Sequence, residues 1–277
     1  MYIPKKVAGR ITKSIKKFQR ILRTAKKRDI NESDTVAVIT DMLSEIFGYD
    51  KYTEITSELA IHGTFCDLAI KVDKKFTFLI ECKAIGLDLK ENHLRQAVNY
   101  GATKGIQWVI LTNGMQWQLH HILFEKPISH EHVFTIQFDA LTSRKDADIE
   151  SLYLLSKEGV QRGSREDYYE RVQNVNRFII GNLILQDDVI KTIRRDLRRF
   201  ADGAKVEASE IYDIIEKEVL KREVIEGEEA DKARARLKRH FRKSIKHKSA
   251  SAVVKKDTIA PQKTISVTEQ LLREAEA

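Results

Sequence analysis

Two charged residues lie two positions apart near the end of an apolar run, residues 78–84. Glu81 and Lys83 would project from the same face of a β-strand, because strand side chains alternate between the two faces. A simple ion pair on an edge strand would add little stability. The alternative is that the pair forms half of a metal-dependent site for phosphodiester hydrolysis.

Asp67 supplies a second carboxylate, as the single acid of the preceding apolar run. Such a group is costly to bury unless it is paired, capped or bound to metal. A hairpin whose opposed residue numbers add to 148 places Asp67 opposite Glu81 and requires a three-residue turn, Asp73 to Lys75. The same register places Cys66 opposite Cys82 on the other, apolar face, where both are predicted to be buried hydrophobic residues and not catalytic thiols.

This arrangement suits cleavage of a phosphodiester bond. Mg²⁺ keeps several waters and takes few protein oxygens, so Asp67, Glu81 and the main-chain carbonyl of Cys82 would suffice as its ligands. Mn²⁺ is expected to substitute for it. Lys83 would position or activate the attacking water and offset phosphate charge.

Asp67 followed by Glu81-Cys-Lys83 resembles the PD-(D/E)xK signature of the restriction-endonuclease-like nuclease superfamily. The sequence Gln96-Ala-Val-Asn-Tyr100 is similar to the Gln-x-x-x-Tyr motif of one branch. That branch contains RecB-type nucleases and the nuclease domain of type I restriction enzyme R subunits. The two residues are four apart and so share a helix face. The resemblance implies that they contact the substrate or steady the site.

The resemblance to the type I R-subunit N-terminus extends over roughly residues 30–140. It rests on Thr35 to Asp50, Leu79 to Ala84 and Leu111 to Trp117. The superfamily often has Pro before its first Asp, where this chain has Cys66. The sequence contains no Gly-x-x-x-x-Gly-Lys-Ser/Thr phosphate loop, so the ATP-driven translocase of an R subunit is not expected, and the nuclease domain is predicted to stand alone.

Hydrophobic periodicity predicts an α/β fold, with a mixed sheet in a restriction-endonuclease-like core followed by a helical region. Strands are expected at residues 52–60, 64–72, 76–84, 108–112, 116–123 and 132–138. Helices are expected at residues 7–25, 33–47, 88–103, 145–160, 165–186, 187–201, 207–247 and 267–276.

The net charge of +8 is unevenly distributed. Residues 1–28 and 232–256 each contain eleven Lys or Arg and no acid. Such clusters attract phosphate backbones, although they can also be solvated helix faces or poorly ordered tails. The residues expected to contact nucleic acid are Lys13, Lys16, Lys17, Arg20, Arg194, Arg198, Arg239, Arg242 and Lys243.

Composition suggests four segments. They are a basic amphipathic helical arm at 1–28, a nuclease-like domain at 29–142, a helical region at 143–248 and a flexible tail at 249–277. The apolar stripe from Ile211 to Leu220 is predicted to be core or, alternatively, the seam of a homodimer.

Two further acids are open alternatives as metal ligands. Glu45 lies on the helix before the strands and Glu58 on the first strand, and the plain interpretation of each is a solvent-facing acid. The histidines at 120, 121, 130 and 132 lack metal-ligand spacing and are interpreted as ordinary strand and loop residues.

The sequence therefore predicts a Mg²⁺-dependent DNA nuclease, with a separate specificity or translocase subunit as a further partner. The alternatives are a catalytically silent nucleic-acid-binding or assembly protein with a nuclease fold, and a nuclease active only with a partner. With two cysteines and no apolar run long enough to span a bilayer, a cytoplasmic protein without membrane contact is expected.

Overall fold

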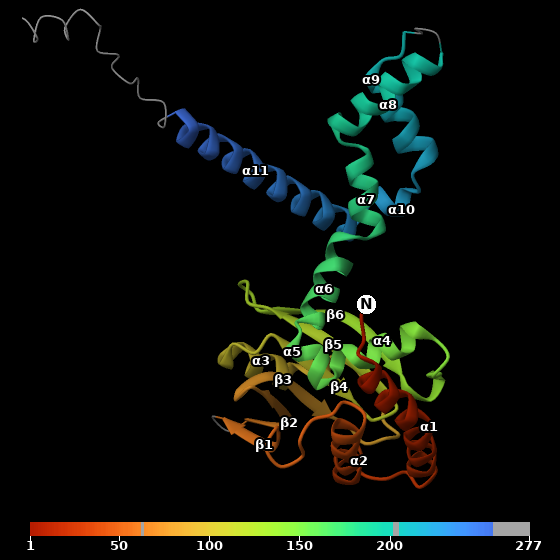
Figure 1. The fold of residues 1–277 in the computed structure, drawn as a ribbon, viewed down its shortest axis with the longest axis vertical. Helices are drawn as coiled ribbons and strands as arrows, with labels where there is room; N and C mark the ends of the chain where they lie inside the picture. Colours follow the sequence, from red (N-terminus) through yellow and green to blue (C-terminus); the bar gives the residue numbers. More distant parts are fainter. Residues whose placement is uncertain (62–63, 202–204, 257–277) are drawn as a thin grey trace, which may run out of the picture. The chain divides into compact units, whose positions relative to one another are not determined.

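The computed structural model describes residues 1–61, 64–201 and 205–256 (Figure 1). The chain divides into two compact units, Met1–Arg171 and Val172–Ala277. The division falls within one helix, α6 (Ser164–Asn174), and not near residue 142 as composition suggested. The first unit therefore includes the basic N-terminal segment as well as the sheet.

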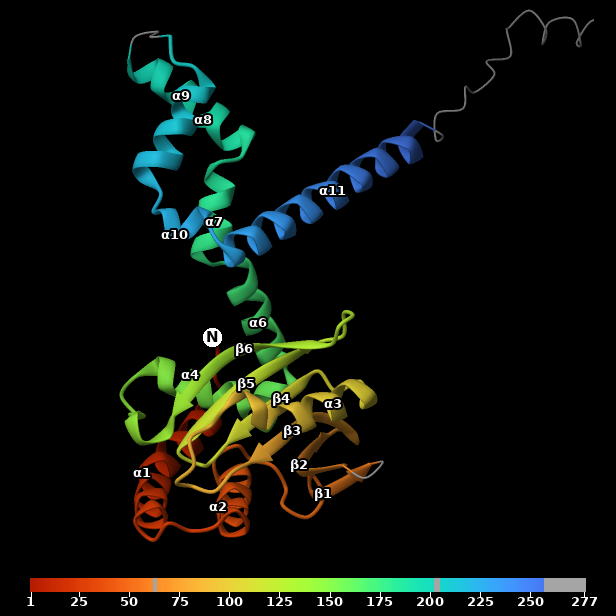
Figure 2. The same ribbon diagram turned by 180° about the vertical axis from the view of Figure 1, so that it is seen from behind.

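The first unit is built on a six-stranded mixed sheet whose strands follow chain order (Figure 2). The strands are β1 (Ile55–Ile61), β2 (Thr64–Val72), β3 (Lys75–Cys82), β4 (Trp108–Thr112), β5 (Gln116–Leu123) and β6 (Ser129–Gln137). All neighbours are antiparallel except β3 and β4. That parallel pair is joined by the 3₁₀ helix η1 (Glu91–Leu94) and by α3 (Arg95–Lys104), as parallel strands require a crossover. The predicted α/β fold with a mixed sheet is confirmed.

Helices cover the two faces of the sheet unequally. The larger core lies between one face and α1 (Lys5–Lys27), α2 (Glu32–Glu45) and α4 (Asp146–Leu155). The short helices α5 (Lys157–Gln161) and η2 (Phe138–Ala140) belong to the same unit. On the other face a smaller core joins α3 to β2, β3, β4 and β5.

The basic N-terminal helix is part of the larger core. Val7, Ile11, Ile15 and Phe18 are buried along one side of α1, and each such side chain contributes about 1.5–3 kcal/mol relative to exposure. Ile21, on the same helix, is 37% exposed. The basic helix of residues 1–28 thus packs as an element of the first unit.

Arg10 connects α1 to the rest of this unit through hydrogen bonds and an ion pair. Its guanidinium donates two hydrogen bonds to Glu158, at 2.7 and 2.6 Å, and further bonds to the carbonyls of Ile46 and Phe47. The bidentate geometry gives this ion pair more strength than a single exposed contact.

The β2–β3 hairpin has the predicted register but a different turn. Leu68 pairs with Ile80 and Ile70 with Phe78, so the opposed numbers add to 148. The turn contains only two residues, Asp73 and Lys74, both at positive φ as a type I′ turn needs. A shift between Ile70 and Lys71 inserts one extra residue in β3. The prediction of a three-residue turn is therefore wrong. A two-residue turn alone would pair residues whose numbers add to 147, and the extra residue of the β-bulge changes this sum to 148.

The two cysteines are both buried, as predicted. They do not share a face: Cys66 packs in the smaller core with Leu79, whereas Cys82 packs in the larger core with Ile80. Burial raises the pKa of the Cys66 thiol to about 12 and that of Cys82 well above its ordinary value. Both therefore remain protonated, uncharged packing groups.

The second unit is helical, as expected, but its helices are shorter than the periodicity predicted. They are α7 (Arg177–Ile184), α8 (Asp187–Phe200), α9 (Ala208–Ile214), the π-helix η3 (Ile215–Val219), α10 (Arg222–Ile225) and α11 (Glu228–Lys256). Asn176 caps the start of α7, and Gly227, at φ +95°, precedes α11. Of the apolar stripe from Ile211 to Leu220, Ile211 and Ile215 pack against Ile190, whereas Ile214 and Val219 are exposed, so only part of the stripe is core.

The segment predicted as a tail is partly helical. α11 continues through residue 256, whereas the helix predicted at 267–276 lies outside the described residues. Within the described ranges, no helix combines the length and the apolar character needed to cross a membrane.

Candidate active site

The candidate site is built where β2 and β3 stop pairing. The ladder of paired residues ends at Leu68 and Ile80. Further along β3, the main-chain N–H of Cys82 donates instead to Oδ2 of Asp67 at 2.7 Å. A side chain thus replaces a strand partner, which holds the carboxylate of Asp67 at the end of β3.

Glu81 and Lys83 are in direct contact, as their spacing predicted. Nζ of Lys83 donates to Oε1 of Glu81 at 2.7 Å and to the main-chain carbonyl of Cys82 at 2.8 Å. Glu81 is only 6% exposed, and its other oxygen, Oε2, is buried and has no hydrogen-bond partner among the residues that the structure describes. The ammonium therefore contacts two of the oxygens that the sequence analysis assigned to Mg²⁺.

Glu32 brings a third carboxylate that the sequence analysis missed. It lies in the first turn of α2, and its Oε2 is 3.6 Å from Nζ of Lys83. Its position in a stretch of capping residues suggested only a helix start, since acids are common in the first turn of a helix. Nothing in the local sequence indicates that this helix begins beside the end of β3.

The electrostatics of the group reflect burial and crowding of like charges. Burial raises the pKa of Glu81, and the charges of Asp67 and Glu32 add to this, against the hydrogen bond and charge of Lys83. Burial lowers the pKa of Lys83, but the hydrogen bond to Glu81 and the neighbouring acids outweigh it, so the net shift is upward. Lys83 is thus held as an ammonium, and the site favours an added positive charge.

Gln96 and Tyr100 lie on α3, which packs over this part of the sheet. The Tyr100 side chain is 5% exposed and its hydroxyl has no hydrogen-bond partner. Burial, with a smaller effect of Cys66, raises its pKa. Gln96 is exposed on the same helix. Tyr100 therefore belongs to the protein interior beside the strands, and Gln96 to the surface.

The structure does not bring Glu45 to this group. Glu45 ends α2, thirteen residues beyond Glu32 and therefore about 20 Å along the helix axis. It forms an ion pair with Lys17 on α1. The main chain of Glu58 lies in β1, but its side chain is outside the described part of the structure.

Within the described residues, no set of three or more His, Cys, Asp or Glu side chains is arranged as a metal site. The histidines of β5 and β6 are among the residues that this finding covers. The proposed site has only two carboxylates and a main-chain carbonyl, so it differs from a set of three or more such side chains.

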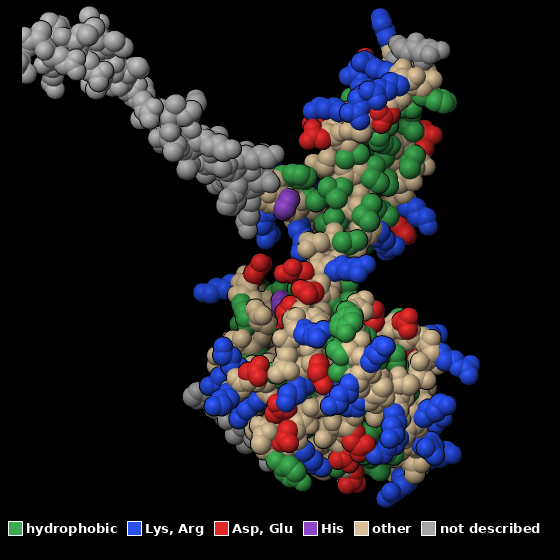
Figure 3. All heavy atoms as spheres, in the orientation of Figure 1, with side chains coloured by type: hydrophobic (Ala, Val, Ile, Leu, Met, Phe, Trp, Pro, Cys, Tyr) green, Lys and Arg blue, Asp and Glu red, His purple; other side chains and the backbone are tan. Residues whose placement is uncertain are grey.

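The residues predicted to contact nucleic acid have different environments. Lys13, Lys16 and Arg20 are exposed on α1, where basic side chains gather on the surface (Figure 3). Lys17 is also exposed but is paired with Glu45.

In the second unit, Arg194 donates to the carbonyl of Val206 at 2.8 Å and contacts Glu207, so its guanidinium is already engaged. The side chains of Arg198, Arg239 and Arg242 are exposed. Lys243 lies in α11, and its side chain falls outside the described part.

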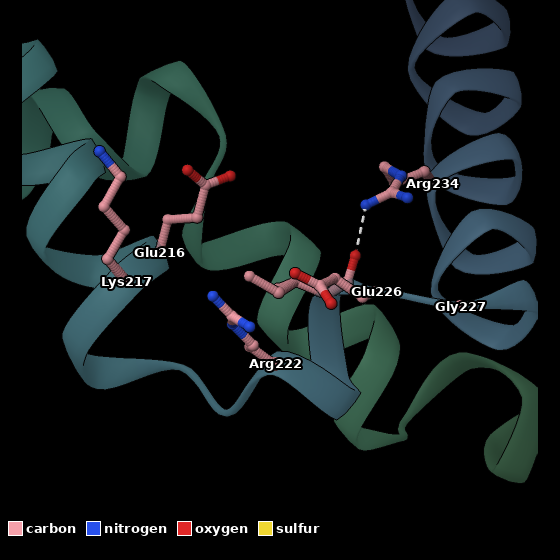
Figure 4. A pocket seen from close by; sticks show the side chains of 7 residues that line it. Glu216, Lys217, Arg222, Glu226, Gly227 and Arg234 are labelled. Atoms are coloured by element: carbon pink, nitrogen blue, oxygen red, sulfur yellow. Dashed lines mark hydrogen bonds between the residues drawn. The ribbon is translucent and has the colours of Figure 1, made fainter.

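Two open pockets lie away from the candidate site. One, of about 450 Å³, is lined by Thr53, Lys71 and the turn residues of the β2–β3 hairpin, at the opposite end of β2 from Asp67. The other, of about 570 Å³, lies in the second unit (Figure 4). Its charged lining residues are Glu216, Lys217, Arg222, Glu226 and Arg234. Both signs of charge are present there, so this pocket points to no particular ligand.

Comparison with known proteins agrees with this geometry. Residues 37–134 match the family described as the type I restriction enzyme R protein N terminus. The matched segment contains Asp67, Glu81, Lys83, Gln96 and Tyr100, which confirms the resemblance seen in the motifs. It points to a nuclease-like role for the first unit. No curated protein and no solved structure matches the chain.

Proposed function

We propose that the first unit is a Mg²⁺-dependent nuclease that hydrolyses phosphodiester bonds of DNA. The observation that carries this proposal is the convergence of Asp67, Glu81 and Glu32 on Lys83 at one end of β3. The match to the type I restriction enzyme family covers this segment of the chain except Glu32.

The donor set fits a hard divalent cation. Asp67, Glu81 and the carbonyl of Cys82 offer only oxygens, which Mg²⁺ and Mn²⁺ prefer. Within the described residues, Oε2 of Glu81 is buried without a hydrogen-bond partner, and a bound cation would provide one. Glu32 is a further carboxylate beside Lys83, whereas Glu45 is paired with Lys17.

Lys83 occupies the position of a cation between these oxygens. Its ammonium contacts Glu81 and the Cys82 carbonyl, so a divalent ion that takes the same oxygens requires Nζ to move. The displaced ammonium would then be free to hold the attacking water and to face the phosphate. When bound, Mg²⁺ would stabilise the charge of the transition state and lower the pKa of water.

The exposed bases of α1 would hold the phosphate backbone. Lys13, Lys16 and Arg20 belong to the same unit as the site, and only four residues separate the end of α1 from α2, which carries Glu32. Arg239 and Arg242 on α11 would add sequence-independent contacts. Type I R proteins belong to a restriction system, so a separate specificity or translocase subunit is proposed as a partner, and a homodimer through the helical unit as a further assembly.

The experiment that tests the proposal is a cleavage assay on a panel of duplex, single-stranded and branched DNA and of RNA. Each substrate is incubated with the full chain and Mg²⁺, Mn²⁺ or EDTA, with Glu81→Ala as the control. Cleavage that needs metal and is lost in Glu81→Ala supports the proposal. Tight DNA binding with no cleavage in any metal, alone or with an added translocase, would instead favour a catalytically silent binding protein.

A further inference from the structure

One face of β5 and β6 carries a continuous set of uncharged hydrogen-bonding side chains. The strand register places residues of the two strands opposite each other on this face, in the pairs Gln116 with Gln137, Gln118 with Thr135 and His120 with His132. The set ends at Ile122, which is buried in the smaller core opposite His130. Alternate residues such as Trp117 and Leu119 point into the larger core. The polar composition of this face is therefore confined to one side of the two strands.

This polar face belongs to the same side of the sheet as Glu81. Leu79 and Leu111 lie in the smaller core, and the register aligns Glu81 with Leu111 and Leu111 with Gln118. Gln118 in turn opposes Thr135. A single row across β3, β4, β5 and β6 thus leads from the candidate catalytic residue to the polar face (Figure 2).

The polar face is accessible where the row ends. Thr135, His132 and Gln137 are exposed, and Gln118 is half-buried. His120 is 5% exposed beneath them; its Nε2 lies 3.5 Å from Oε1 of Gln118, and its Nδ1 has no hydrogen-bond partner in the described part of the chain. A buried ring nitrogen without a partner is costly, so a ligand or water that reaches it would be stabilised.

Two histidines of this face, His120 and His132, have lowered pKa values and are neutral near pH 7. Burial, with the charges of His132 and His130, lowers the pKa of His120 to about 3. Burial also lowers the pKa of His132, whose Nε2 lies 2.7 Å from the hydroxyl of Thr135. His130 has an acid nearby, since Glu91 lies 3.7 Å from it. Neutral groups add little attraction for phosphates and suit hydrogen bonds to base edges.

From these observations we infer that the polar face of β5 and β6, centred on Gln118 and Thr135, contacts base edges of duplex DNA and sets the sequence preference of cleavage. This inference rests on the proposed function. The spacing is suitable: three inter-strand steps separate Glu81 from Thr135, which is about 14 Å. At about 3.4 Å per base pair, that distance places the contacted bases roughly four base pairs from the cleaved phosphate. In the major groove, the amide of Gln suits hydrogen bonds to adenine.

The test is to map cleavage positions in a pool of duplex DNA with random sequence. The wild-type chain is expected to show a base preference about three to five base pairs from the cut. In the variant Gln118→Ala with Thr135→Ala this preference, taken as the ratio between bases within one digest, should fall on the order of tenfold. A matched control is Gln107→Ala with Thr103→Ala, two exposed residues near the start of β4 and the end of α3, which should keep the wild-type preference.

A second variant tests the chemistry of the contact. Gln118→Glu replaces an amide that suits adenine by a carboxylate that accepts from cytosine N4, so the preferred base should change toward cytosine. Far-UV circular dichroism checks that the variant folds like the wild-type chain.

The outcomes separate this inference from the proposed function. Cleavage with a flat base profile, or a profile that survives both Gln118 variants, overturns the inference and leaves the nuclease intact. If the wild-type chain does not cleave, the same pool is selected by binding to Glu81→Ala. A selected preference that depends on Gln118 then supports the contact alone, and absence of any DNA binding overturns both.

Discussion

The carboxylate of Asp67 accepts a hydrogen bond from the main-chain N–H of Cys82, at 2.7 Å, where the β2–β3 ladder has ended. The carboxylate oxygens of Asp67 therefore have both a structural role, as hydrogen-bond acceptor, and a proposed catalytic role, as metal ligand. Substitutions that keep the hydrogen bond but remove the charge can separate the two.

Asp67→Asn should retain folding stability and lose cleavage. Its amide carbonyl can still accept from the N–H of Cys82, but it has no charge for a cation. Asp67→Ala leaves that N–H without its partner and should lower the free energy of unfolding by about 1–3 kcal/mol. Urea unfolding followed by tryptophan fluorescence measures the free energy of unfolding of the first unit, because both tryptophans of the chain, Trp108 and Trp117, lie in its sheet. Equal stability of the two variants would contradict a structural role for Asp67.

Metal affinity should rise with pH through the raised pKa of Glu81. Because this pKa lies above the ordinary value of 4.5, the carboxyl keeps its proton to a higher pH than an exposed glutamate does. Metal binding needs the charged form, so affinity declines as the pH falls through that pKa. Calorimetric titration of Mn²⁺ into the full chain, from acidic to neutral pH, measures the dependence. Glu81→Gln should remove it, whereas Glu45→Gln should leave it unchanged.

Lys83→Met should abolish cleavage yet preserve or tighten metal binding. The substitution removes an ammonium that contacts Glu81 and the Cys82 carbonyl, and so removes the competitor of the metal ion for these oxygens. Lys90→Met is the matched control, since Lys90 is exposed and, within the described residues, forms no ion pair with the acids that surround Lys83. Weaker Mn²⁺ binding in Lys83→Met would show that Lys83 supports the site and does not compete for it.

The hairpin shows how far the sequence could define the site. Parity of side-chain direction limited the β2–β3 register to an even sum, and an assumed three-residue turn selected 148, the sum that the pairs from Leu68 to Ile70 have. Parity could not predict how the chain turns between the two strands, because a two-residue turn with a bulge and a three-residue turn give the same register. The prediction that Cys66 and Cys82 share a face is wrong for a related reason, because regular pairing stops at Leu68.

The sequence did not show which residues the packing of whole helices and strands brings together. Glu32 lies well before the first predicted strand, and only the docking of α2 on β3 places it beside Lys83. The basic charge of α1 suggested a separate arm, whereas its apolar stripe and Arg10 make it part of the core. Charge predicted the exposed side of this helix correctly and said nothing about the buried side.

Arg10→Ala should destabilise the first unit, although it lies in a segment rich in exposed charge. The guanidinium pairs with both oxygens of Glu158 and bonds two main-chain carbonyls, and about two-thirds or more of each side chain is shielded from solvent. Loss of these bonds should cost on the order of 2 kcal/mol. Lys13→Ala, on the exposed side of the same helix, should change stability by less than about 0.5 kcal/mol. The two free energies come from the same fluorescence-detected urea titration, and similar values for both would contradict the anchoring role of Arg10.

The exposed bases of α1 should determine the salt dependence of DNA binding. The triple variant Lys13→Ala, Lys16→Ala and Arg20→Ala should bind duplex DNA more weakly at every sequence, because phosphate contacts carry no sequence information. The slope of log affinity against log salt should fall by about 0.9 for each phosphate that the variant no longer neutralises. Fluorescence anisotropy with the Glu81→Ala chain measures binding without cleavage. A second triple variant, at the exposed residues Lys74, Lys75 and Lys104, makes the same change in net charge away from α1. An equal decrease of slope in both triples would mean that net charge, and not the surface of α1, governs binding.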